Sequence, residues 1–185
     1  MNDRDFARVA ELYAKAIPTF SAFSVFSLND LVKYATIIGI MHLSRPDLKS
    51  YLVEQSDVEI ALMDMPVLHT LLHSFHDCKY KQLFLSLLDL ETVLKEDPYL
   101  HKSLSLIIEK LRLKAYQQYL DSFKSYVLLY RWQVVMSRCT LQSMADNFGV
   151  SMQFINNELA HFISEGQIHA KIDRVCSICD IFIRR

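Results

Sequence analysis

The chain contains only three glycines and four prolines among its 185 residues, and this scarcity constrains its fold more than any other feature. Glycine and proline mark most of the tight turns that a many-stranded protein requires. Hydrophobic residues make up 51% of the chain, which is enough for a sizeable core. An apolar chain with so few turn residues is expected to form long helices, and we predict a mostly α fold.

Apolar residues recur at steps of three and four over most of residues 1–125, which is the spacing of one helix face. Phe6, Val9 and Tyr13 lie on such a face in a helix that Pro18 ends. The other predicted helices are one that begins after a Ser27–Asp30 capping box, and segments at Leu48–Glu54, Val58–Met63, Pro66–Cys78, Lys81–Lys95 and Lys102–Phe123. Such helices with short connectors predict an α-solenoid, a stack of TPR-like helical repeats.

The pattern changes near the end of the chain. A short amphipathic helix over Thr140–Phe148 stops at Gly149, and a second helix begins at Ser151. Ile168 to Asp173 then alternates apolar and polar residues, as a half-buried strand does, and Val175 to Ile183 can return as a second strand. Two helices followed by a β-hairpin predict a winged-helix domain.

These patterns divide the chain into three predicted parts. Residues 1–125 form the helical-repeat solenoid, 126–139 form an atypical insertion or linker, and 140–185 form the winged-helix subdomain. The formal net charge is −1, which gives no general attraction to nucleic acid or anionic lipid. No segment approaches the roughly 18 consecutive apolar residues of a membrane span, and the early charges give no signal peptide, so we expect an intracellular protein with no membrane partner.

Several local motifs occur within this framework: Asp3-Arg-Asp-Phe, Arg45-Pro-Asp-Leu, Arg112-Leu-Lys-Ala-Tyr, Met144-Ala-Asp-Asn-Phe-Gly-Val and Gly166-Gln-Ile-His-Ala-Lys-Ile-Asp. Together they resemble the PCI domain shared by proteasome, signalosome and initiation-factor subunits. Within it they are most similar to the family of non-ATPase lid subunits of the 26S proteasome regulatory particle that is numbered 7 in yeast and 6 in mammals. The resemblance corresponds to the C-terminal part of that longer chain and ends after Val175, so the winged helix is expected to be truncated at its C-terminus.

The resemblance implies a non-catalytic scaffold subunit that acts in ubiquitin-dependent protein degradation, in the cytoplasm and nucleus. It implies other PCI-domain subunits as partners, and no cofactor, nucleic acid or small-molecule substrate. In this family, winged-helix sheets are understood to join edge to edge, since a small sheet leaves strand N–H and C=O groups unpaired. The residues expected to make subunit contacts are Ile168, His169, Ala170, Lys171, Ile172, Asp173, Val175, Ile178 and Ile181.

Two other functions remain open at this point. A signalosome subunit shares the same domain and much of the same pattern. A winged helix can also bind DNA, but its recognition helix then carries Lys and Arg toward phosphates and base edges. The candidate helix from Ser151 to Glu165 has neither residue type and carries Glu158 and Glu165, so we expect protein contacts instead.

Two groups of residues could bind a metal ion. His69, His73 and His76 recur on one helix face, but the apolar stripe beside them predicts that they lie on the solvated face, and the spacing indicates no carboxylate or fourth ligand. Cys176 and Cys179 form half of a zinc knuckle, with His161 and His169 near them in the sequence. Residues three apart on a strand point to opposite faces, which disfavours this pair. We therefore expect no metal site, and no catalytic motif indicates an enzyme.

Overall fold

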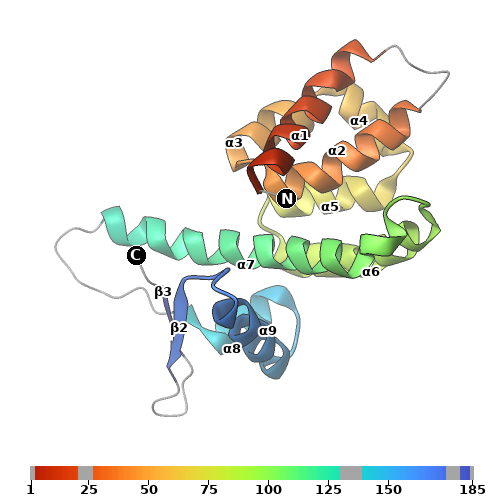
Figure 1. The fold of residues 1–185 in the computed structure, drawn as a ribbon. Coiled ribbons are helices and arrows are strands. Elements are labelled where there is room, and N and C mark those ends of the chain that lie inside the picture. Colours follow the sequence, from red (N-terminus) through yellow and green to blue (C-terminus); the bar gives the residue numbers. More distant parts are fainter. Residues whose placement is uncertain (1–2, 21–26, 130–138, 174–179, 184–185) are drawn as a thin grey trace. The chain divides into compact units, whose positions relative to one another are not determined.

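The computed structural model describes residues 3–20, 27–129, 139–173 and 180–183 (Figure 1). It divides the chain into two compact units, Met1–Leu111 and Arg112–Arg185, and each is considered by itself. Helices dominate both units, which confirms the predicted mostly α fold. Among the described residues, no helix combines the length and the hydrophobicity that crossing a bilayer demands.

The first unit is built from successive packed helices. They are α1 (Asp3–Ala16), α2 (Leu28–His42), α3 (Arg45–Leu48), α4 (Ser56–Met63), α5 (Pro66–His76), α6 (Tyr80–Glu96) and the beginning of α7 (Leu104–Leu129). Short 3₁₀ turns lie at Ile17–Thr19 and His101–Ser103, and a π-helical turn at Lys49–Val53 follows α3. Helix α1 packs along α2, α5 packs along α6, and α4 contacts both α2 and α5 (Figure 1).

Helix α2 begins where its capping box predicts, whereas the predicted helical segment at Leu48–Glu54 begins earlier, as α3 at Arg45. The Ser27 hydroxyl oxygen accepts a hydrogen bond from the Asp30 N–H at 3.0 Å and caps α2. Ser44 caps α3 in the same way, through the Asp47 N–H at 3.4 Å, with Pro46 in the first turn. These caps supply acceptors to N–H groups that have no partner inside the helix, and so they fix where each helix begins.

A buried carboxylate joins α2 to the segment after α6. The Asp97 side chain is 2% exposed and accepts a hydrogen bond from Lys33 Nζ at 2.6 Å. It also accepts hydrogen bonds from the Tyr34 hydroxyl at 3.1 Å and from the N–H groups of Tyr99 and Leu100 at 2.9 and 3.1 Å. Burial by itself raises the pKa of Asp97, but these donors outweigh it and bring the pKa down to about 2.

The second unit contains the later part of α7, then β1 (Cys139–Thr140), α8 (Leu141–Phe148), α9 (Met152–Ser164), β2 (Ala170–Asp173) and β3 (Asp180–Ile183). The two helices and the hairpin occur in the predicted winged-helix order. Gly149 ends α8 at φ +67°, in the left-handed conformation that its position predicts. The short strand β1 is absent from the sequence prediction, because two residues are too few to show a period of two.

The division between the units differs from the predicted boundary at residue 125. Helix α7 continues to Leu129, and the boundary falls within it, after Leu111. The reason is that Tyr116 and Tyr119 of α7 pack on the rings of α8 and α9, so this part of the helix belongs to the winged-helix core. The predicted insertion at 126–139 thus begins inside α7, and its residues 130–138 lie outside the described part of the chain.

Candidate subunit-docking surface

The candidate docking surface is the outer edge of strand β2. The three strands are ordered β1-β3-β2, and both neighbouring pairs are antiparallel. Strand β2 pairs with β3 from Ala170 opposite Ile183 to Asp173 opposite Asp180. Within the segments that the structure describes, β2 has β3 as its one neighbour, so its other edge is available to a strand from another chain.

Strand β3 does not offer a second such edge. Ile181 is opposite Ile172 of β2 and also opposite Cys139 of β1, so it is paired on both sides within the chain. Ile181 stays a predicted contact residue, but the structure gives its backbone two partner strands within the chain, so it does not belong to an open edge. A strand at the centre of a sheet has its backbone groups occupied by its neighbours. Of the other expected contact residues, Val175 and Ile178 lie outside the described residues.

The side chains of β2 and the residues before it alternate as the sequence predicts. Ile168 and Ala170 are each 6% exposed, whereas His169 and Lys171 are exposed, and Ile172 is intermediate. The apolar side chains are therefore turned into the unit, and the polar ones are turned to its surface. Asp173 ends the strand. This arrangement holds the strand in place with one face while a partner's backbone can approach from the edge.

The start of the strand is tied to the end of helix α9. Gly166 has φ +72°, and the following N–H groups of Gln167 and Ile168 both donate to the Phe162 carbonyl, at 2.9 and 3.2 Å. The side-chain amide of Gln117 on α7 donates to the Gln167 carbonyl at 3.0 Å. The chain thus changes direction over a few residues between α9 and β2. These hydrogen bonds fix where β2 begins, and with it the position of its edge.

A partly buried polar cluster joins α7 to α9. Glu158 of α9 accepts a hydrogen bond from the Tyr116 hydroxyl at 2.8 Å and pairs with the Arg112 guanidinium at 2.9 Å. The Tyr116 ring is fully buried and lies 5.0 Å from the ring of Phe148 between centroids. Burial, and secondly the charge of Glu158, raise the pKa of the Tyr116 phenol. This phenol therefore stays protonated and keeps donating to Glu158.

Tyr119, one helical turn along α7, joins the same core to β1 and α8. Its hydroxyl oxygen accepts a hydrogen bond from the Asn147 amide at 3.0 Å and a weak one from the Cys139 thiol at 3.9 Å. Burial raises the pKa of Tyr119. The two tyrosines together position the helices that support the sheet. Arg112 and Tyr116 are four residues apart and share a helix face, a signal visible in the sequence, but their partner Glu158 is 42 residues from Tyr116.

The exposed surface of α9 bears on the DNA alternative. Glu158 is turned inward and paired with Arg112, so it does not face solvent as a free charge. The helix still contains no Lys or Arg, and Glu165 follows it. Lys171 is the exposed cation of β2. A nucleic-acid-binding face needs several cations for phosphates, and α9 provides none.

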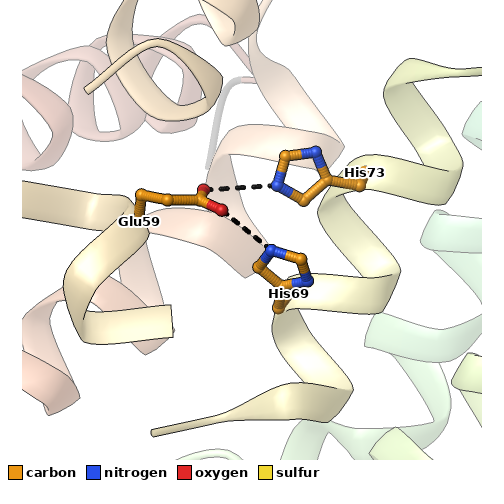
Figure 2. Close-up of side chains that lie close together, drawn as sticks. All are labelled: Glu59, His69 and His73. Carbon is orange, nitrogen blue, oxygen red and sulfur yellow. Dashed lines mark hydrogen bonds and ion pairs between the residues drawn. The ribbon is translucent and has the colours of Figure 1, made fainter. Parts of the chain in front are cut away.

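The histidines of α5 differ from the prediction. His69 and His73 are partly buried, and each ring nitrogen Nε2 contacts one oxygen of Glu59 on α4, at 2.9 and 3.3 Å (Figure 2). Sequence spacing did not reveal this carboxylate, because Glu59 belongs to a different helix. His76 lies apart from this group and pairs with Asp77 at 3.2 Å. Cys176 and Cys179 lie outside the described residues.

The chain is similar to known proteins over most of its length. The PCI domain model matches residues 55–181. A 26S proteasome non-ATPase regulatory subunit 6 homolog of Arabidopsis thaliana is 31% identical over 97% of this chain and 43% of its own length. The 26S proteasome regulatory subunit rpn7 of Schizosaccharomyces pombe is 31% identical over 95% of this chain and 42% of its own length. A COP9 signalosome complex subunit 1 of Arabidopsis thaliana is 27% identical over 80% of this chain and 31% of its own length.

The chain thus spans less than half the length of the curated relatives that it matches. The similarity to subunit 6 and rpn7 proteins confirms the resemblance that the sequence motifs indicate. The matched residues begin in the loop before α4 and include α8, α9 and β2, where the winged-helix order is observed. Helical pairs, the winged helix and the matching family model lead to the same conclusion: this chain belongs to the PCI domain family.

Proposed function

We propose that this chain is a structural subunit of the lid of the proteasome regulatory particle, and that it acts in ubiquitin-dependent degradation through contacts and not through catalysis. The similarity to regulatory subunit 6 and rpn7 proteins over nearly the whole chain supports this proposal. Those relatives are named as non-ATPase or regulatory subunits. The proposal places the chain in the cytoplasm and nucleus, which fluorescence imaging of a tagged chain tests.

The observation that carries the proposal is the edge of β2. The side chains of Ile168, just before β2, and of Ala170, within it, are buried in the unit, β3 pairs with one edge of the strand, and no described strand pairs with the other edge. A strand from the winged-helix sheet of another PCI-domain subunit could continue the sheet there. His169 and Lys171 are exposed and would border the incoming strand, where they could select among partners.

Affinity capture of the tagged chain followed by mass spectrometry tests the proposal directly. Subunits of the proteasome regulatory particle are expected in the captured material, in amounts comparable to one another. Capture without any of them, from cells in which the particle is intact, would contradict a role as a lid subunit. The same measurement tests the second candidate, a signalosome subunit, which the weaker similarity to signalosome subunit 1 supports. Signalosome subunits in place of proteasome subunits would favour that candidate.

A pair of variants tests the edge itself. Lys171→Pro removes a backbone N–H from the middle of β2, and proline interrupts pairing at a sheet edge. Lys171→Ala removes the same side chain but keeps that N–H. If backbone pairing joins the subunits, capture should fall at least about tenfold, or about 1.4 kcal/mol, in the proline variant and stay within about twofold in the alanine variant, because a proline ring in the middle of β2 disrupts the strand on which the partner would pair.

Circular dichroism melting shows whether each variant is folded, which separates a lost contact from a lost fold. A folded Lys171→Pro variant that still captures its partners at the original level would argue against edge pairing. Equal losses in both variants would instead assign the contact to the lysine side chain.

A further inference from the structure

We propose that Glu59, His69 and His73 form a binding site for one divalent transition-metal ion of the zinc type. The site lies in the first unit, on the surface where α4 and α5 meet (Figure 2). It is separate from the β2 edge in sequence and independent of the proposed role in the proteasome.

The local structure brings the three side chains together. His69 and His73 are four residues apart on α5, so their rings lie on one helix face, with centroids 4.3 Å apart. Helix α4 ends at Met63 and α5 begins at Pro66, and this short turn returns the chain so that Glu59 faces both imidazoles. One ligand atom from each residue can be chosen so that all three lie within 4.8 Å of one another.

The distances are close to those of a metal site. Two ligand atoms that are each about 2.0–2.1 Å from a tetrahedral zinc ion are roughly 3.3 Å apart. His73 Nε2 lies 3.3 Å from one Glu59 oxygen, and His69 Nε2 lies 2.9 Å from the other. An ion could therefore replace the protons between these atoms once the side chains draw the three ligand atoms, which lie within 4.8 Å of one another, closer together.

The ligand chemistry favours a transition metal over magnesium or calcium. Two imidazoles and one carboxylate match the preferences of zinc, nickel, copper and iron, whereas Mg²⁺ and Ca²⁺ prefer oxygen ligands alone. The side chains of Glu59, His69 and His73 are 33%, 40% and 32% exposed, so an ion can enter and water can occupy its remaining position. Bonds to both helices would make the ion a link between α4 and α5.

Isothermal titration calorimetry of the 185-residue chain with Zn²⁺ tests the site. One ion per chain is expected to bind, with no comparable binding of Mg²⁺. His69→Asn, His73→Asn and Glu59→Gln should each weaken Zn²⁺ binding at least about tenfold, the change that about 1.4 kcal/mol produces. His76→Asn is the matched control, because His76 is on the same helix but pairs with Asp77 instead. It should bind Zn²⁺ as the unchanged chain does.

The four cysteines of the chain could bind Zn²⁺ elsewhere, so the titration is repeated with Co²⁺. Thiolate ligands give cobalt an intense charge-transfer band in the near ultraviolet, which nitrogen and oxygen ligands lack. The proposal expects bound cobalt to give a visible spectrum without that band. The His69→Asn/His73→Asn double variant should lose this cobalt spectrum. Absence of stoichiometric binding, or binding that persists in a double variant shown by circular dichroism to be folded, would overturn it.

Discussion

At the scale of single residues, the Asp97 carboxylate shows how a buried charge can stabilise this fold. Three kinds of donor meet there: the Lys33 ammonium group, the Tyr34 hydroxyl and two backbone N–H groups. A buried charge is unfavourable unless it is paired and hydrogen-bonded. Asp97 meets that condition, and the donors hold its pKa at about 2, below the ordinary value of 3.8.

The lowered pKa predicts a pH dependence of stability. A carboxylate whose pKa is lower in the folded than in the unfolded chain stabilises the fold above the unfolded pKa, and this contribution is lost as the pH falls from about 4 toward 2. Asp97→Asn should therefore reduce the free energy of unfolding of the first unit by about 2 kcal/mol at pH 7, and by much less near pH 2. Urea unfolding at both pH values, followed by circular dichroism, measures the difference.

Asp89→Asn serves as the control, because Asp89 is exposed on α6. Its effect should stay within about 0.5 kcal/mol at either pH. If Asp97→Asn cost the same at pH 7 and pH 2, the carboxylate charge would not be the source of the stability.

At the scale of elements, the turn between α8 and α9 is fixed by backbone conformation. Gly149 has φ +67°, and the Val150 N–H donates to the Ala145 carbonyl at 3.1 Å. Ser151 then caps α9 by accepting from the Phe154 N–H at 3.2 Å. One left-handed residue and one cap thus lie between the two helices and constrain the angle between them.

Replacing that glycine tests the importance of its conformation. Gly149→Ala should destabilise the second unit by about 1 kcal/mol, because a β-carbon crowds the next carbonyl in the left-handed region. Gly149→Asn should cost less, since asparagine tolerates this conformation better than alanine. Thermal or urea unfolding measures both variants. An alanine variant as stable as the unchanged chain would show that the turn can adopt another conformation.

At the scale of the whole molecule, the two units have separate cores although one helix runs through both. Tyr116 and Tyr119 of α7 pack with Phe148 in the second unit. In the first unit, Leu71 and Leu72 of α5 are fully buried. Separate cores predict that damage to one unit leaves the other folded.

Two core substitutions test this independence. Phe148→Ala leaves a cavity beside both tyrosines and should cost about 3–5 kcal/mol in the second unit. Hydrogen exchange measured by mass spectrometry should show faster exchange in α8 and α9 and unchanged protection in α2 and α5. Leu71→Ala, which should cost about 2–5 kcal/mol, is expected to give the reverse pattern. Loss of protection throughout the chain from either variant would mean that the units unfold together.

Several features were determined by the sequence alone because they depend on residues close together in the chain. The helices follow from apolar spacing, the start of α2 follows from Ser27, and the left-handed turn follows from Gly149. The alternation that begins at Ile168 predicts β2, with the observed buried and exposed sides. The similarity to PCI-domain proteins was also readable from motifs, without coordinates.

Other features were decided only by the tertiary structure, because the partners are distant in sequence. Tyr34 and Asp97 are 63 residues apart, Tyr116 and Glu158 are 42 apart, and Glu59 meets His73 from another helix. A one-dimensional pattern shows that such a residue is polar, but its partner and its burial depend on how the helices pack. Likewise, the pairing of β1 places β3 at the centre of the sheet and makes β1 and β2 its edges, of which β2 is the longer.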